Sequence, residues 1–241
     1  NYSSSPTLTD CTFTSNAANG LNGEGGGMYS DASSPTLTDC TFDGNLAYSG
    51  GGMYNLNGSP NGSPTLANCT FTSNSADNGG GGMSNASSSP TLTNCTFTSN
   101  SVGSGSGGGI SNASSSPTLT DCTFTHNSAS RDGGGMDNQE GSSPTLANCN
   151  FCGNTSGTGN RNVDGSIGGK SSNNRLLLNC NTGDVNFDLQ IDSGDLGYLL
   201  ALWGASSVLN ADINQDGEVN GADLAYILSY FGGTTDATTA D

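Results

Sequence analysis

Apolar residues recur along the first two thirds of the chain in a fixed pattern that turn-forming residues interrupt. The segment Ser-Pro-Thr-Leu-x-(Asp/Asn)-Cys-x-Phe occurs six times, and its prolines are 29, 29, 26, 27 and 27 residues apart. Within each copy Cys and Phe alternate with polar residues, as in a strand, while Pro, Gly and Asn mark turns. Each repeat therefore predicts short strands joined by turns, and one repeat predicts one coil of a parallel β-solenoid. About six coils, stacked at roughly 4.8 Å, would form a rod roughly 30 Å long over residues 1–156.

Identical residues of successive coils are expected to form ladders along the rod. Cys and Phe, two residues apart, point inward together, and the Leu three residues before each Cys requires a bend between them. The Asn three residues after each Phe is expected to bond to its neighbours in the ladder and to satisfy turn amides. Gly runs closed by Met or Ile supply corners with positive φ. The predicted ladders contain Cys11, Cys40, Cys69, Cys95, Cys122 and Cys149; Phe13, Phe42, Phe71, Phe97, Phe124 and Phe151; and Asn16, Asn45, Asn74, Asn100, Asn127 and Asn154.

The residue before each ladder cysteine is always Asp or Asn, which favours a turn at the bend. The alternative is that neighbouring carboxylates there share a cation. Several Asn-x-Ser/Thr triplets, such as those at Asn85 and Asn112, are potential glycosylation sites.

Six of the eight cysteines occupy one ladder position, where parallel Cβ vectors give poor disulfide geometry. They predict a column of small apolar side chains, with a metal-binding thiolate column as the alternative. Cys152 lies off the ladder, and Cys180 is the only other cysteine. The sequence therefore predicts a Cys152–Cys180 disulfide and an oxidising, extracellular location.

The charge balance excludes several functions. The chain has 21 Asp and Glu against 4 Lys and Arg, a net charge of −17, which disfavours nucleic acid and anionic membranes and favours divalent cations. No apolar run approaches the length of a membrane span. The first four coils contain no Lys, Arg or His for a polysaccharide lyase, and His126 is expected on the surface. Asp132, Asp137 and Glu140 beside Arg131 are the nearest approach to a hydrolase carboxylate pair, so we predict no enzyme.

The composition changes after residue 156. Residues 157–182 are rich in Gly, Asn and Ser and predict a linker with one terminal strand. Two matching twelve-residue loops, 184–195 and 212–223, then carry oxygen side chains at positions 1, 3, 5, 9 and 12 and a backbone carbonyl at position 7, the pattern of EF-hand calcium loops. Each loop leads into a short amphipathic helix, with Gly204 and Gly232 as C′ caps. The predicted ligands of two Ca²⁺ ions are Asp184, Asn186, Asp188, Gln190, Asp192, Asp195, Asp212, Asn214, Asp216, Glu218, Asn220 and Asp223.

The Phe-x-x-Asn and Gly-Gly-(Met/Ile) motifs of about residues 1–155 resemble the repeats of bacterial polymorphic outer-membrane-protein-type β-helix proteins. This resemblance implies a right-handed parallel β-helix on a secreted or surface protein, often an adhesive one. The duplicated loop and helix of about residues 183–233 is similar to dockerin type I modules, which implies a cohesin-like partner.

The match to dockerin modules has three departures. Leu189 stands where Gly is usual at loop position 6, so the first site is expected to be weaker. Ser193-Gly194 and Gly221-Ala222 replace the usual recognition pair Ser-Thr, and the step of 28 residues between the loops is short. Residues 183–233 are thus predicted to be a small α-helical, EF-hand-like domain, and residues 234–241 a polar tail.

Two functions stay open on this evidence. Asn1 aligns with Asn112 in the repeat, so the first coil is incomplete, and either upstream sequence or another copy would cover its edge. The first function is therefore a calcium-binding extracellular subunit that assembles head to tail into a filament or surface layer. The alternative is a secreted adhesive or carbohydrate-associated β-helix anchored to a cohesin-like protein. A polysaccharide-degrading enzyme is less favoured.

Overall fold

The computed structural model describes residues 1–20, 22–57, 63–158, 162–168, 170–172, 174–177, 193–204 and 219–230. Contacts divide the chain into two compact units, with the boundary between Leu176 and Leu177. The first unit is built of strands and the second contains two helices, and each is described separately below.

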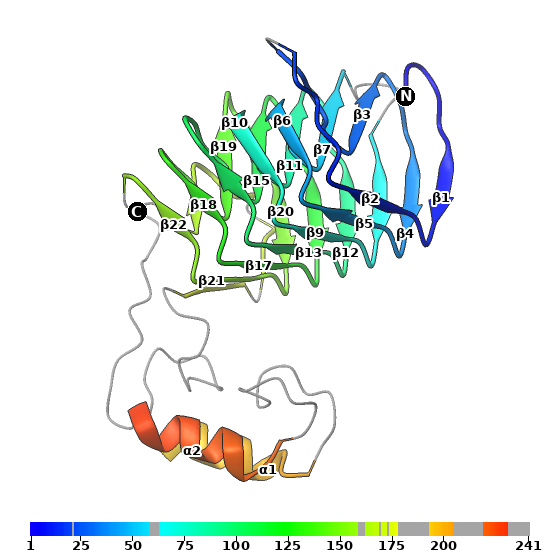
Figure 1. The fold of residues 1–241 in the computed structure, drawn as a ribbon. Coiled ribbons are helices and arrows are strands. Elements are labelled where there is room, and N and C mark those ends of the chain that lie inside the picture. Colours follow the sequence, from blue (N-terminus) through cyan, green and yellow to red (C-terminus); the bar gives the residue numbers. More distant parts are fainter. Residues whose placement is uncertain are drawn as a thin grey trace. The chain divides into compact units, whose positions relative to one another are not determined.

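Four parallel sheets form the sides of the first unit (Figure 1), and we name each sheet by its inward-facing residue. The leucine sheet consists of β1 (Thr7–Thr9), β4 (Thr36–Thr38), β8 (Thr65–Ala67), β12 (Thr91–Thr93), β16 (Thr118–Thr120) and β20 (Thr145–Ala147). The phenylalanine sheet consists of β2 (Thr12–Thr14), β5 (Thr41–Asp43), β9 (Thr70–Thr72), β13 (Thr96–Thr98), β17 (Thr123–Thr125), β21 (Asn150–Cys152) and β24 (Arg175–Leu177).

The other two sheets complete each coil. The alanine sheet consists of β6 (Leu46–Ser49), β10 (Ser75–Gly79), β14 (Ser101–Val102), β18 (Ser128–Ala129) and β22 (Thr155–Ser156). The methionine sheet consists of β3 (Met28–Asp31), β7 (Met53–Leu56), β11 (Met83–Ala86), β15 (Ile110–Ala113), β19 (Met136–Gln139) and β23 (Val163–Asp164). Each coil thus visits the four sheets in turn, which confirms the parallel β-helix expected from the repeats.

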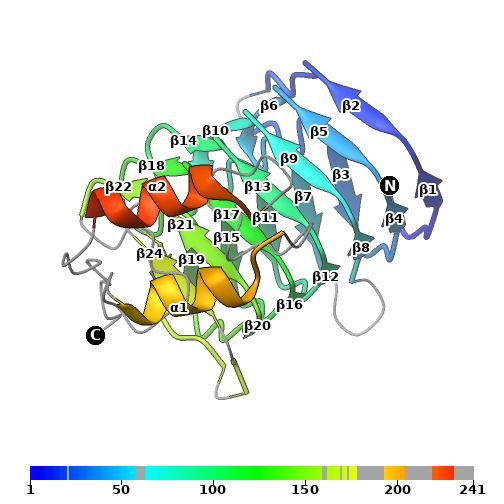
Figure 2. The same ribbon diagram turned by 90° about the horizontal axis from the view of Figure 1, so that it is seen from below.

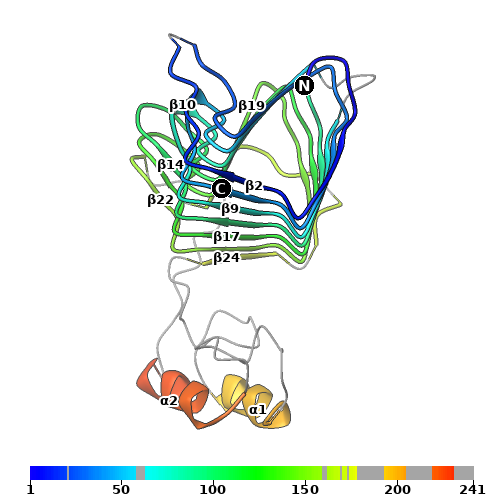
Figure 3. The same cartoon turned by 45° about the vertical axis from the view of Figure 1, so that its right-hand side comes forward.

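Successive coils stack with their repeats in register. Phe97 pairs with Phe71 on one side and with Phe124 on the other, and Thr pairs with Thr beside them. Figure 2 shows β5, β9, β13 and β17 side by side in the phenylalanine sheet, and Figure 3 shows the coils lying one behind another along the axis. The parallel register places chemically equal residues about 4.8 Å apart, so any feature of one coil becomes a column.

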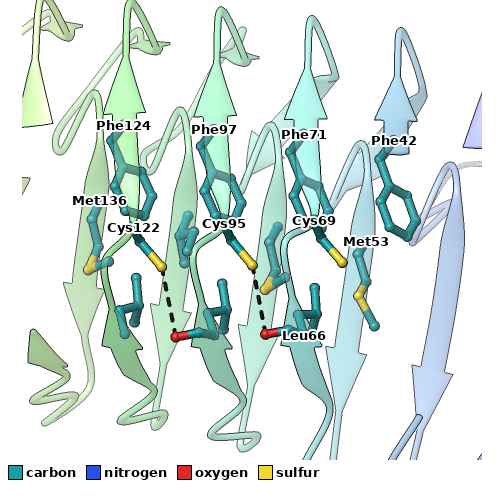
Figure 4. Packing of buried hydrophobic residues seen from close by; sticks show 14 of the residues in the cluster. Phe42, Met53, Leu66, Cys69, Phe71, Cys95, Phe97, Cys122, Phe124 and Met136 are labelled. Carbon is teal, nitrogen blue, oxygen red and sulfur yellow. Dashed lines mark hydrogen bonds between the residues drawn. The ribbon is translucent and has the colours of Figure 1, made fainter. Parts of the chain in front are cut away.

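The interior consists of such columns of apolar side chains (Figure 4). The rings of Phe71 and Phe97 are stacked with centroids 4.7 Å apart and planes within 4°, and both are fully buried. Cysteines, leucines and methionines line the remaining sides of the same core. Stacked coils therefore bury a continuous core although hydrophobic residues make up only 31% of the chain.

The corners of the coil require residues that tolerate positive φ. The bend between Leu and Cys is made by the Asp or Asn that precedes each ladder cysteine, as at Asn94 with φ of 51°. Another corner is made by glycine, as at Gly80 with φ of 64°. A Cβ on the neighbouring Gly82 would lie 2.8 Å from the ring of Phe97, so a larger residue would displace the core.

The ladder asparagines link the coils from inside. Asn100 donates from Nδ2 to Oδ1 of Asn127 (2.9 Å) and to the carbonyl of Phe71 (2.9 Å). Its own Oδ1 accepts from the backbone N–H and from Nδ2 of Asn74, at 3.0 and 2.9 Å. The structure places all six predicted asparagines in this column, and each amide satisfies groups of neighbouring coils.

A second asparagine column, which the sequence analysis did not identify, runs under the methionine sheet. It contains Asn55, Asn85, Asn112 and Asn138, whose amides are bonded at 2.8 to 2.9 Å. Asn85 and Asn112 are buried, so the interpretation of their triplets as glycosylation sites is wrong for the folded chain. The available signal was an Asn two residues after the Met or Ile of every Gly run except the first, where Ser30 takes this position.

Residues 157–182 were expected to form a linker with one strand, and two described strands within this range extend two of the sheets. β23 pairs with β19 in the methionine sheet, and β24 joins β21 in the phenylalanine sheet. Solenoid structure therefore continues beyond residue 156 in the part of this region that the structure describes.

The second unit contains α1 (Ser193–Ala201) and α2 (Gly221–Tyr230). Leu199, Val219 and Ile227 form its buried core. Gly204 follows the end of α1 by three residues and has a φ of 79°. Its N–H donates to the carbonyl of Val219 at 2.9 Å and not to a carbonyl of the helix, so it does not make the hydrogen bond of the expected C′ cap. Gly232, the second predicted cap, lies outside the described residues. Neither described helix is long and apolar enough to span a membrane.

We expect Asn100→Ala to lower the free energy of unfolding by roughly 2–4 kcal/mol, because it leaves buried donors and acceptors of two neighbouring coils without partners. The control Thr91→Ala changes an exposed side chain of the same coil and should alter the free energy by no more than about 0.5 kcal/mol. Urea denaturation followed by circular dichroism measures both. Equal losses in the two variants would contradict a special role for the asparagine column.

Candidate functional site

The cysteine column is part of the core. The six described ladder cysteines, Cys11 to Cys149, are free, and the Sγ of Cys95 donates to the carbonyls of Thr93 (3.4 Å) and Leu66 (3.8 Å). Burial raises the pKa of Cys40. A hydrogen bond to Cys95 together with burial raises the pKa of Cys69. At Cys40 and Cys69 these causes favour the protonated thiol, which is a poor metal ligand. At Cys95 and Cys149 a hydrogen bond with Cys122 acts in the opposite direction and lowers the pKa.

Cys152 is disulfide-bonded and buried at the end of β21. Its predicted partner, Cys180, lies outside the described residues, so the pairing itself stays a prediction.

The acidic residues singled out beside Arg131 do not converge as a group. Glu140 is exposed at a corner with φ of 54° and accepts a hydrogen bond from Ser114 Oγ at 3.0 Å. Asp132 accepts a hydrogen bond from the hydroxyl of Thr158. Asp137 instead pairs in register with Asp164 of the next coil, a residue that the sequence analysis missed.

Asp137 is the most perturbed carboxyl group described. Its side chain is fully buried, Nε2 of Gln139 donates to its Oδ2 at 2.6 Å, and its Oδ1 has no hydrogen-bond partner. Burial, together with the charges of Asp164 and Asp132, raises its pKa to about 7, against a smaller lowering by Gln139.

Asp137 is not accessible as a glycosidase carboxyl group must be. Its side chain is fully buried, whereas the two carboxyl groups of a glycosidase flank the bond that is cleaved and must both reach the sugar. Three or more His, Cys, Asp or Glu side chains do not form a metal-binding group anywhere in the described ranges.

Most of the predicted calcium ligands lie outside the described residues. These are Asp184, Asn186, Asp188, Gln190, Asp192, Asp212, Asn214, Asp216 and Glu218. Asp195 lies in α1, and its side chain is not described. Asn220 and Asp223, positions 9 and 12 of the second loop, are the two that the structure shows.

Asn220 and Asp223 form the N-terminus of α2. Asn220 Oδ1 accepts from the backbone N–H of Ala222 at 2.8 Å, and the N–H of Asn220 donates to Asp223 Oδ2 at 2.9 Å. This reciprocal arrangement is a capping box. It holds a buried carboxylate at the junction of loop and helix, where the last ligand of a calcium loop is needed. The donor chemistry of these two residues therefore fits the ion.

Three large apolar side chains of the helical unit are exposed to solvent. Leu200 is 53% exposed, Trp203 47% and Leu228 55%, although each belongs to the helical apolar pattern of the sequence. Leu199 and Ile227 beside them are fully buried. The helical unit thus buries some of its apolar residues and leaves others exposed.

Comparison with known proteins gave one family. A protein-family model described as "Right handed beta helix region" matches residues 1–151 and, in a second alignment, residues 33–207. No curated protein matches the chain.

We expect the first unit to lose stability as the pH rises through 7, because the pKa of folded Asp137 is above its ordinary value of 3.8. The folded state then binds the proton more tightly than the unfolded state, so this stabilisation is complete below about pH 4 and is lost above pH 7. Asp137→Asn should remove this dependence and raise the melting temperature at pH 8. Thermal unfolding at a series of pH values measures it.

Asp77→Asn is the matched control, because Asp77 is an exposed carboxyl on β10. It should leave the pH profile between 4 and 8 unchanged. An Asp137→Asn profile that follows that of the unsubstituted protein would contradict the assignment.

Proposed function

The chain belongs to the right-handed β-helix family, and we propose that it is a non-catalytic extracellular structural protein whose copies assemble head to tail into a filament or surface layer. The observation that carries the proposal is the exposure of Leu200, Trp203 and Leu228 on the helical unit. Exposed apolar residues on a small unit of a rod-forming chain favour a joint between copies.

A structural role is favoured over catalysis by the chemistry of the coils. Members of this family are often polysaccharide-degrading enzymes. In this chain the interior positions repeat the same Phe, Cys, Leu and Asn from coil to coil, and the carboxyl group of Asp137 is fully buried. Such repetition serves stacking, whereas a hydrolase needs two carboxyl groups that reach the sugar.

Calcium is the proposed ion of the helical unit. Two Ca²⁺ ions would be held by the loops 184–195 and 212–223, with Asn220 and Asp223 among the ligands of the second. The buried Asp223 carboxylate supports this assignment. A bound ion would hold each loop against its helix and thereby orient the apolar residues of the helices.

An extracellular location is part of the same proposal. The disulfide at Cys152 requires an oxidising compartment, and the buried column of thiols is protected from oxidation by the core around it.

The exposed apolar residues also favour a second candidate function. A secreted β-helix anchored through its helical unit to a cohesin-like protein would use the same side chains. The two candidates differ in behaviour, because only the first predicts polymers of the isolated protein.

We expect the full chain in Ca²⁺ to form regular filaments or sheets in negative-stain electron microscopy, and a chelator to disperse them. Leu228→Glu should prevent assembly, because a charge in a buried contact is costly. Leu46→Glu replaces a similarly exposed leucine of β6, at 44% exposure, and should still assemble. Single rods at high protein concentration in Ca²⁺ would contradict self-assembly and favour the anchoring function.

Calcium binding is measured separately by isothermal titration of the full chain. We expect two ions per chain, and one ion in each of the variants Asp188→Ala and Asp216→Ala, since each removes a side-chain ligand from one loop. Asp43→Ala, on the phenylalanine sheet, should keep both ions. A variant of either loop that retained two ions would contradict the assignment of ligands.

A further inference from the structure

Two columns of threonine cover the outward side of the leucine sheet, which we call the threonine face. Leu66, Leu92 and Leu119 point inward from the middle of their strands and are buried. The first and last residues of every strand therefore point outward. The threonine face consists of Thr7, Thr36, Thr65, Thr91, Thr118 and Thr145 in one column and Thr9, Thr38, Ala67, Thr93, Thr120 and Ala147 in the other.

The threonine face is a regular two-dimensional array. All five strand pairings of the leucine sheet join equivalent residues without a bulge. Neighbouring threonines are therefore about 4.8 Å apart across strands and roughly 6.6 Å apart along a strand. Because Thr is β-branched, each side chain has few rotamers to lose when it becomes ordered against a surface. Thr91, Thr93 and Thr118 at the centre are exposed to solvent.

Strand propensity does not explain this array. Thr is favoured in strands generally, so propensity alone would distribute it over all four sheets. The strands of the methionine sheet contain no Thr, and those of the alanine sheet contain only Thr155. Threonine is thus concentrated on the leucine sheet and the adjoining phenylalanine sheet.

The threonine face is also the uncharged side of an acidic molecule. The chain has a net charge of −17. Outward positions carry Asp43 on the phenylalanine sheet, Asp77 on the alanine sheet, and Asp31, Asp137 and Asp164 on the methionine sheet. No strand of the leucine sheet contains a charged residue. The exposed Asp10, Asp39 and Asp121 lie at the corner that borders the face on one side. The array itself is therefore uncharged, and a partner that covers it needs no charge.

The size of the threonine face argues against a stable protein partner. Five steps of about 4.8 Å by a column spacing of roughly 6.6 Å give an array on the order of 200 Å². A standard protein interface buries about 800 Å² on each side. A small, flat, neutral and periodic face instead fits a solid whose surface repeats at the same spacings.

Ice is the solid that these features fit. Oxygen atoms on the prism surface of hexagonal ice repeat along two perpendicular directions at nearly the spacings of the threonine columns. Threonine hydroxyls can occupy lattice positions and exchange hydrogen bonds with ice, while the methyl groups between them exclude liquid water. We propose that the threonine face adsorbs to ice and so restrains the growth of ice crystals.

Adsorbed molecules would slow the growth of ice by making the ice surface between them curved. Ice that grows between adsorbed molecules must bulge, and a curved surface melts at a lower temperature than a flat one. The freezing temperature then falls below the melting temperature. This effect needs many small adsorbed molecules and no deep binding cleft, which agrees with the dimensions of the face.

The test measures thermal hysteresis and the incorporation of fluorescently labelled full chain into a growing ice hemisphere, both in Ca²⁺. We expect the unsubstituted protein to show hysteresis and to enter the ice. Thr93→Lys should lose both, because it places a long charged chain at the centre of the array. Thr93→Val, which keeps the shape, should retain more activity than Thr93→Lys.

Ser101→Lys is the matched control, since Ser101 lies in the same coil but on β14 of the alanine sheet. It should leave ice adsorption unchanged, and circular dichroism verifies that all variants fold. Absence of hysteresis and of incorporation in the unsubstituted protein would overturn the proposal, as would equal losses in Thr93→Lys and Ser101→Lys. Adsorption to crystalline cellulose or chitin without any effect on ice would also overturn it and assign the face to a crystalline polysaccharide.

Discussion

The structure of the first unit depends on the buried asparagine amides that join one coil to the next. An amide inside an apolar core must find partners for two N–H donors and its carbonyl oxygen, because an unsatisfied group there costs about 1–3 kcal/mol. In this chain Asn74, Asn100 and Asn127 find those partners only in the same residue of the neighbouring coil and in a carbonyl of the preceding one. A shift of one residue in the register of any coil would break every such bond. The same register keeps the phenylalanines stacked, whereas the length of the repeat varies between 26 and 29 residues without disturbing it.

Because the inward positions must match from coil to coil, variation is confined to the outward positions and the corners. The four sheets therefore differ in their outward residues. The leucine sheet carries threonine without charge, whereas the methionine sheet carries two tyrosines stacked at 5.8 Å, then serines, then the pair Asp137 and Asp164. Any function of the solenoid therefore lies on its outer faces. This also explains why a fold shared with polysaccharide-degrading enzymes does not by itself specify a reaction.

The ends of a solenoid differ from its middle, since a terminal coil has one neighbour instead of two. At the last coils the repeat is degenerate. Asn162 takes over as the partner of Asn154, and two carboxyl groups stand in register where earlier coils have serine or tyrosine. Stability is therefore expected to be lowest and most dependent on pH at this end. The six thiols of the cysteine column, by contrast, are distributed along the core and reinforce it through packing and weak hydrogen bonds to carbonyls.

The solenoid fold could be predicted from the sequence alone, because the repeats indicate the number of residues in each coil, the residues that face inward and the positions of the bends. Cys95, Phe97 and Asn100 recur at constant spacing, and only one stacking keeps all three in register. The columns that these three residue types form in the stacked coils were thus predictable from the local sequence pattern. The two helices of the C-terminal unit were predictable for a similar reason, since Leu199 and Ile227 lie at helical spacing between a cap and a glycine.

Only the tertiary structure decided which residues share a face. The pairing of Asp137 with Asp164 depends on the path of a coil that lacks the repeat motif, so no spacing in the sequence indicated it. The second asparagine column was visible as a pattern, yet its burial followed from the corner before it. Likewise, the threonines became one flat face because positive φ at Asp or Asn turns the chain between the leucine and phenylalanine sheets. The local sequence pattern predicts which residues alternate between the two sides of a strand. The backbone angles at the corners determine in which direction each strand, and therefore each of its sides, faces.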